Sequence, residues 1–261
     1  MFCNGEPVDA ALVSAALVNY GHFTSLQVRG GAVQGWALHM QRLQQGTREL
    51  FDATLDEGQL RAWLRQALQH GELVDASVRI TVFARDFDFR RPLRAVPVDV
   101  LIAVGAPAAR PALARSVLPL AYQRDLPHIK HLGTFPLFHH RRQAVQQGFD
   151  DAVFVDTAGR ISEGSTWNIV FWDGAQVVWP QAAALRGTTE QLLVDGLQWQ
   201  GERQLRREVM LDALAAFRGA AACNASGVWS LARIGDQRFG GSDELLLRLQ
   251  QAQAHAAWQP L

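Results

Sequence analysis

The sequence is poor in cysteine and lysine, and it has no long apolar run. Cys3 and Cys223 are the two cysteines among 261 residues, and their wide separation provides no disulfide framework. No stretch reaches the roughly 18 consecutive apolar residues of a membrane span, and no basic segment followed by an apolar run marks a signal peptide. Basic and acidic residues balance at 25 each, which argues against nucleic acid or a membrane surface as a partner. We therefore expect a soluble cytoplasmic protein.

The scarcity of lysine draws attention to one position. Of the 25 basic residues, one is a lysine and the rest are arginines; that lysine is Lys130, in the run H-I-K-H-L-G. A composition that favours arginine this strongly would be expected to replace a lysine that only carries solvated charge. Arginine stays protonated, whereas lysine can lose its proton and form a Schiff base. We interpret Lys130 as a reactive residue, and retention by chance is the alternative interpretation.

The first part of the chain mixes strand and helix signals. An alternating run followed by Gly30-Gly31 predicts a hairpin, and apolar residues at helical spacing follow it. The predicted strands are 23–28, 77–83 and 98–104, and the predicted helices are 36–51 and 56–70. The Ala/Pro/Gly-rich segment 107–112 breaks both periodicities and is the predicted linker. We expect a small α+β domain over 1–106.

The second part, 113–261, has short strand signals separated by turns and followed by amphipathic helices. The predicted strands are 117–122, 152–155, 169–172, 176–179 and 221–225. The predicted helices are 136–148, 189–199, 208–217 and 243–256. Many short strands with appended helices are typical of a barrel-like α/β domain.

Lys130 is followed by the run S-E-G-S-T-W-N-I at 162–169 and by G-T-T at 187–189. In this order, the three motifs resemble the class IV aminotransferases. These enzymes of fold-type IV depend on pyridoxal 5'-phosphate (PLP) and include branched-chain and D-amino acid transaminases and aminodeoxychorismate lyase. The resemblance covers nearly the whole chain. It implies an α/β (α+β) fold of two domains, the cofactor PLP, a small amino substrate and a homodimer.

The resemblance also implies a role for individual residues. Lys130 would hold PLP as a Schiff base, and Glu163 would stabilise the protonated pyridine nitrogen. The residues implied at the cofactor phosphate are Arg42, Thr188, Thr189 and Ser226, and those implied at the substrate are Ser25, Arg79 and Asn224. Each has an ordinary alternative, such as a solvated arginine or a threonine N-cap. The histidines at 128, 131, 139 and 140 lack the ligand spacing of a metal site, so no metal is predicted.

The reaction type is left open between two candidates. Phe135 stands where branched-chain transaminases carry a tyrosine, and the runs F-T-S at 23–25, K-H-L at 130–132 and C-N-A at 223–225 resemble the lyase. Transamination is the more common outcome on this scaffold, and local likeness does not determine the reaction. We therefore place a transaminase first, aminodeoxychorismate lyase second, and a non-catalytic relative that keeps the fold third.

Overall fold

A computed structural model describes residues 2–7, 18–109 and 111–261, and the chain divides into two compact units. The first unit comprises Met1–Ala108, Ile129–Gly133 and Trp258–Leu261, and the second comprises Ala109–His128 and Thr134–Ala257. The segment that carries Lys130 therefore belongs to the first unit, although the sequence places all of 113–261 in one domain. The linker over 107–112 stays a prediction, and its residue 110 lies outside the described residues.

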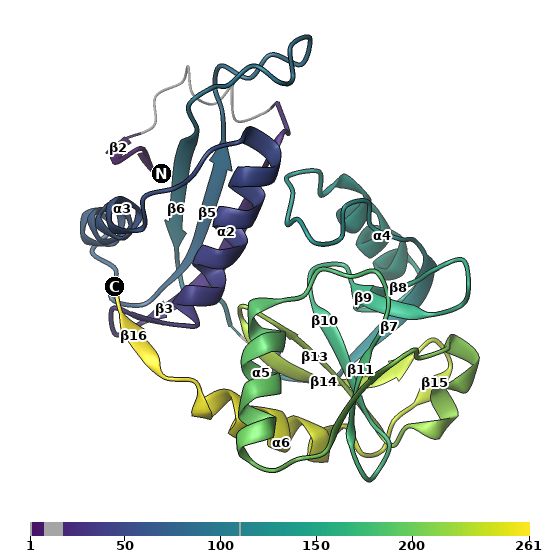
Figure 1. Cartoon of the computed structure of the whole chain (residues 1–261). Coiled ribbons are helices and arrows are strands. Elements are labelled where there is room, and N and C mark those ends of the chain that lie inside the picture. The colour runs from purple at the N-terminus through teal and green to yellow at the C-terminus, as the bar shows by residue number, and fades with distance from the viewer. Residues whose placement is uncertain (1, 8–17, 110) are drawn as a thin grey trace. The chain divides into compact units, whose positions relative to one another are not determined.

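The first unit is built on one antiparallel sheet with the strand order β16-β4-β3-β5-β6-β1-β2 (Figure 1). The strands are β1 Phe2–Cys3, β2 Glu6–Pro7, β3 Gly21–Arg29, β4 Ala32–Gln34, β5 Ala76–Phe83, β6 Asp99–Gly105 and β16 Trp258–Pro260. Alternate side chains of a strand point to opposite faces. Leu26 and Ile80 therefore face the core, and Ser25 and Arg79, which are directly paired in register, face the other way.

Among the described residues of the first unit, two helices cover the core face of this sheet. They are α2 Trp36–Phe51 and α3 Glu57–His70, and they confirm the helices predicted from apolar spacing. Met40 and Leu43 of α2 and Leu64 of α3 are buried in the same hydrophobic cluster as the inward strand residues. One face of the sheet is thus closed by packing, which leaves the opposite face for polar side chains.

The segment around Lys130 is added to the edge of β3. The N–H of Phe23 donates to the carbonyl oxygen of Lys130 at 2.9 Å, and the N–H of Leu132 donates to Gly21 at 3.0 Å. His22 and His131 form the bridge between these bonds. Backbone pairing of this kind fixes the position of the lysine more firmly than an unpaired loop would.

The second unit contains a mixed sheet with the strand order β12-β11-β10-β13-β14-β7-β8-β9, and β15 pairs with β14 (Figure 1). The strands are β7 Arg115–Ala121, β8 Asp151–Val155, β9 Ile161–Gly164, β10 Asn168–Trp172, β11 Val177–Pro180, β12 Gln204–Arg207, β13 Gly219–Asn224, β14 Gly227–Ile234 and β15 Gln237–Arg238. Strands β8 to β11 and most of β13 and β14 are buried along their length. This explains why their sequences read as continuous apolar runs.

Three α-helices and one short 3₁₀ helix accompany this sheet. They are α4 Phe135–Gln146, α5 Thr188–Trp199, α6 Ser242–His255 and η1 Leu211–Ala216. The prediction of a helix over 208–217 is thus wrong in type and length. Helices α5 and α6 touch at Gly196, where an added Cβ would lie 2.1 Å from the carbonyl oxygen of Ala252. Within the described residues, no helix is both long and apolar enough to cross a membrane.

Candidate active site

In the first unit, Lys130 lies against the ring of Phe23. The Nζ atom of Lys130 is 4.9 Å from the ring centroid, and the guanidinium carbon of Arg79 is 3.6 Å from the same centroid. Cations are attracted to the face of an aromatic ring. Lys130, Arg79 and Ser25 are therefore brought together around Phe23, on strands β3 and β5 and on the segment paired with them.

In the same unit, α2 places the buried side chains of His39 and Arg42 beside Thr24 of β3. Nδ1 of His39 lies 2.7 Å from Oγ1 of Thr24, and Nη1 of Arg42 donates to that hydroxyl oxygen at 3.4 Å. Burial, together with the nearby charges of Arg42 and Lys130, lowers the pKa of His39 to about 3. His39 is therefore neutral at neutral pH. Because the guanidinium can only donate, the hydroxyl of Thr24 accepts from Arg42, and it forms a second hydrogen bond with Nδ1 of His39.

The arrangement collects positive charge near Lys130. Burial lowers the pKa of Arg42 to about 10, so its guanidinium still carries a proton at neutral pH. A planar guanidinium suits a phosphate dianion, to which it can donate two parallel hydrogen bonds. Sequence analysis assigned a role to Arg42 but none to His39 or Thr24, although Thr24 lies in the run F-T-S and His39 stands three residues before Arg42.

In the second unit, Glu163 of β9 is buried and paired with Arg124. Nε of Arg124 donates to Oε1 of Glu163 at 2.8 Å, and the two side chains are 3% and 4% exposed. An isolated carboxylate is costly to bury, and a guanidinium at this distance favours its charged form. Glu163 is therefore held as an anion. It is a buried strand residue and not a surface carboxylate.

The N-terminus of α5 is open to an anion. Its N-cap is Gly187, and no side chain caps it, so the first-turn N–H groups have no partner within the helix. Gly187 donates from its N–H to Oδ1 of Asn168 at 3.1 Å, and Nδ2 of Asn168 donates to Leu185 at 2.6 Å. Asn168 thus shapes the turn before the helix. An uncapped helix N-terminus of this kind attracts phosphate.

Thr189 lies beside the turn that joins β13 to β14. Its hydroxyl donates to the carbonyl oxygen of Asn224 at 2.8 Å, and Oδ1 of Asn224 accepts from the N–H of Ser226 at 2.8 Å. Thr188 and Thr189 are both buried. The second unit therefore brings together Thr188, Thr189, Asn224 and Ser226, which the sequence places up to 38 residues apart, as Thr188 and Ser226 are.

Comparison with known proteins identifies the family. The family model described as amino-transferase class IV matches residues 21–234. The chain belongs to the class IV aminotransferases. It is 28% identical over 76% of its length to a bifunctional aminodeoxychorismate lyase / D-amino acid transaminase of Mycobacterium tuberculosis, covering 75% of that protein.

Solved structures of the same family share the fold of this class IV protein. A 4-amino-4-deoxychorismate lyase from Pseudomonas aeruginosa has a TM-score of 0.79 at 22% identity, with 95% of this chain and 96% of that chain covered. The branched-chain amino acid aminotransferase of Escherichia coli has a TM-score of 0.81 at 19% identity, with 91% and 85% covered. The predicted fold class is therefore confirmed.

The family uses PLP, and its members are transaminases or lyases, so the chain is an enzyme of that class. The residues present fit PLP in each unit taken by itself. The uncapped N-terminus of α5 suits a phosphate, and the buried anion Glu163 suits a protonated ring nitrogen. In the first unit, Lys130 offers an amine of the kind that can form a Schiff base, and the charges of Lys130 and Arg42 both act on His39.

Glu190 follows Thr188 and Thr189 in the first turn of α5, and its contacts account for its burial. Its Oε1 accepts from Arg186 at 3.2 Å and from Arg206 at 3.1 Å, while its side chain is 1% exposed. Oε2 of Glu190 has no hydrogen-bond partner. The carboxylate thus ties the first turn of α5 to β12.

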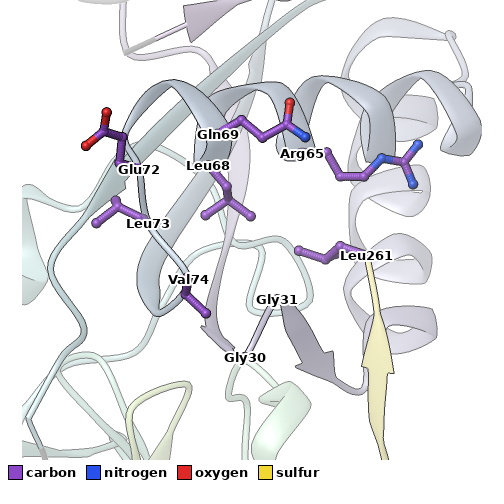
Figure 2. A pocket seen from close by; sticks show the side chains of 9 residues that line it. All are labelled: Gly30, Gly31, Arg65, Leu68, Gln69, Glu72, Leu73, Val74 and Leu261. Atoms are coloured by element: carbon purple, nitrogen blue, oxygen red, sulfur yellow. The ribbon is translucent and has the colours of Figure 1, made fainter.

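A pocket of about 480 Å³ in the first unit contains none of the predicted site residues (Figure 2). It lies where Gly30 and Gly31 connect β3 to β4, at the opposite end of β3 from the strand pairing of Lys130. Figure 2 shows Leu68 and Leu261 pointing toward one another across it. This pocket is therefore separate from the group around Lys130.

Gly187→Ala is expected to destabilise the N-terminus of α5. The added Cβ would lie 2.2 Å from Oδ1 of Asn168, which cannot move without losing both of its hydrogen bonds. Overpacking of this kind costs about 1–3 kcal/mol. Thermal unfolding and PLP titration should both show the loss. Gly240→Ala is the matched control, because no atom lies within 4 Å of its added Cβ, and equal behaviour of the two variants would contradict the prediction.

Proposed function

We propose that the chain is a PLP-dependent transaminase whose amino donor carries a carboxylate that Arg79 binds. The observation that supports this is the shared contact of Arg79 and Lys130 with the ring of Phe23, at 3.6 and 4.9 Å. A small amino acid whose carboxylate pairs with Arg79 can present its amino end toward Lys130. Ser25, paired with Arg79 in register, offers a further hydrogen bond to the same carboxylate.

Each residue has a distinct task in this proposal. PLP, when bound, supplies the electron sink that acidifies the substrate Cα. Lys130 binds the cofactor and then moves a proton at its Nζ atom. Glu163 holds the proton on the ring nitrogen. Arg42 and Thr189 bind the phosphate, together with Thr188 and Ser226.

Aminodeoxychorismate lyase is the second candidate. The runs K-H-L and C-N-A favour it, since both match the lyase pattern at residues that the structure places beside Phe23 and beside Thr189. In this reaction Ser25 and Asn224 would contact the ring and carboxylates of the substrate. A relative named for both activities is consistent with either candidate. We further propose that the chain acts as a homodimer, which the family resemblance supports, and that it acts in the cytoplasm.

The absorption spectrum of the PLP-loaded protein distinguishes the two reactions. We expect one of D- or L-alanine, D- or L-glutamate or a branched-chain amino acid to convert the bound cofactor to its pyridoxamine form. A cofactor band that no amino acid changes, together with pyruvate release from aminodeoxychorismate, would favour the lyase. A protein that binds no PLP would contradict both.

Arg79→Ala is expected to raise KM for the preferred amino donor about 10- to 100-fold, because a hydrogen-bonded charge contributes about 1.5–3 kcal/mol. Steady-state kinetics with the wild-type protein and the variant would measure it. Arg65→Ala is the control, since Arg65 is exposed on α3 and belongs to none of the groups around Lys130. An unchanged KM in Arg79→Ala would remove Arg79 from the substrate.

A further inference from the structure

Arg124 and Glu163 meet across a buried strand. Arg124 follows β7, and Glu163 lies on β9; β8 pairs with both strands and separates them in the sheet (Figure 1). The segment after β7 is tied to β8, because the N–H of Tyr122 donates to the carbonyl oxygen of Val155 at 3.0 Å. Regular backbone pairing therefore positions the guanidinium of Arg124 beside Glu163, although the segment that carries Arg124 is irregular.

The pair is enclosed, which makes its charge state depend on both partners. The side chains of Arg124 and Glu163 are 3% and 4% exposed. A buried carboxylate without a cation tends to take up a proton, whereas a guanidinium remains charged at every physiological pH. Removing Arg124 would therefore favour the neutral form of Glu163, and a neutral acid cannot balance the charge of a protonated ring nitrogen.

Two ionisable groups on the same segment, Tyr122 and Asp125, do not replace Arg124. Tyr122 packs against Phe154 with ring centroids 4.7 Å apart. Burial raises the pKa of its hydroxyl, as do the charges of Asp125 and Glu163, while Arg124 lowers it. Tyr122 is thus neutral at neutral pH, and Asp125 carries the same sign of charge as Glu163. Among these neighbours, Arg124 alone carries the opposite charge.

We propose that Arg124 is a positioning residue that acts through Glu163, keeping that carboxylate charged and aimed so that it holds the proton on the pyridine nitrogen of PLP. The inference rests on the role proposed above for Glu163. In this role Arg124 controls the electronic state of the cofactor, and it does not need to contact the substrate. A substrate-binding arginine would change KM, whereas this role changes kcat and the spectrum of the bound cofactor.

The test is a double-mutant cycle of Arg124→Gln and Glu163→Gln, read by the absorption spectrum of bound PLP, the PLP dissociation constant and single-turnover rates. Each single variant is expected to alter the spectrum in the same direction and to slow the half-reaction on the order of 10²-fold. The double variant should be no slower than Glu163→Gln alone, because residues that act as a unit are not additive. Arg124→Lys should restore part of the wild-type spectrum.

Arg160→Gln is the matched control. Arg160 donates to the buried carboxylate of Asp156 at 2.7 Å in the turn between β8 and β9, so its loss also breaks an ion pair with a buried acid in the same hairpin. It should lower the unfolding midpoint without changing the spectrum. If Arg124→Gln does not fold, the spectrum of bound PLP in Arg124→Lys tests the inference in its place.

The outcomes separate this inference from the proposed function. If Glu163→Gln changes the spectrum and Arg124→Gln does not, the inference fails and the role of Glu163 stands. Rate losses that multiply in the double variant would also overturn it, because Arg124 would then act independently of Glu163. If neither variant changes the spectrum of bound PLP, the proposed role of Glu163 fails, and the inference fails with it.

Discussion

Lys130→Ala is expected to abolish turnover while leaving the fold intact. No other lysine exists in the chain, so no second side chain of this type can substitute for it. The backbone of residue 130 accepts its hydrogen bond from Phe23 through the carbonyl oxygen, which alanine retains. The variant should therefore lose turnover, while the pairing of this segment with β3 should remain. Amino-donor-dependent turnover and thermal unfolding, measured on the same preparation, would test both halves of the expectation.

Lys130→Arg is the control for charge at this position. Arginine keeps the cation near the Phe23 ring but is a poor nucleophile, so it should be as inactive as alanine. If Lys130→Arg were active, the lysine would act only through its charge. If Lys130→Ala kept full activity, the assignment of the reactive residue would be wrong.

Glu163→Gln is expected to slow the half-reaction on the order of 10²-fold or more, the scale of a positioned group that manages a proton. Glutamine has nearly the same shape and can still accept the hydrogen bond from Nε of Arg124. It cannot carry the negative charge that stabilises a protonated ring nitrogen. The fold and KM should change little, and kcat should fall, which single-turnover kinetics with the preferred donor can resolve.

Glu208→Gln provides a comparison for Glu163→Gln. Glu208 also pairs with an arginine, Arg160, at 2.7 Å, but its side chain is 55% exposed. An exposed ion pair contributes at most about 1 kcal/mol, so this variant should match the wild-type rate. A rate for Glu163→Gln equal to that of Glu208→Gln would mean that the ring nitrogen has another partner.

The helices were predictable from the sequence because amphipathic spacing is a local signal. The run from Trp36 to Phe51 has the period of a helix and forms α2. Strand β14, Gly227–Ile234, was not predicted, since Ser230 and Arg233 interrupt the apolar run that marks a buried strand. Only its pairing with β13 and β7 selects the strand conformation, and pairing partners are not visible in a local pattern.

The site was predictable only in part, for a related reason. Lys130 was recognisable from its rarity, and Glu163 from the run S-E-G in its order along the chain. The contact of Arg124 with Glu163 joins residues 39 apart and depends on the order of three strands. The chemistry of an arginine alone does not indicate which acidic residue of the chain it pairs with, so the sequence could not identify Glu163 as the partner of Arg124. The chain of Thr24, His39 and Arg42 likewise depends on how α2 packs on β3.

The addition of Ile129–Gly133 to the first unit has a consequence for how this protein can be divided. Neither unit is an uninterrupted stretch of chain. A fragment that ends at Ala108 would lack the backbone that pairs with Gly21 and Phe23, as well as strand β16 beside β4. Its sheet would keep two bare edges, which invite self-association. Limited proteolysis or gene splitting after Ala108 should therefore yield fragments that self-associate instead of two independently soluble domains.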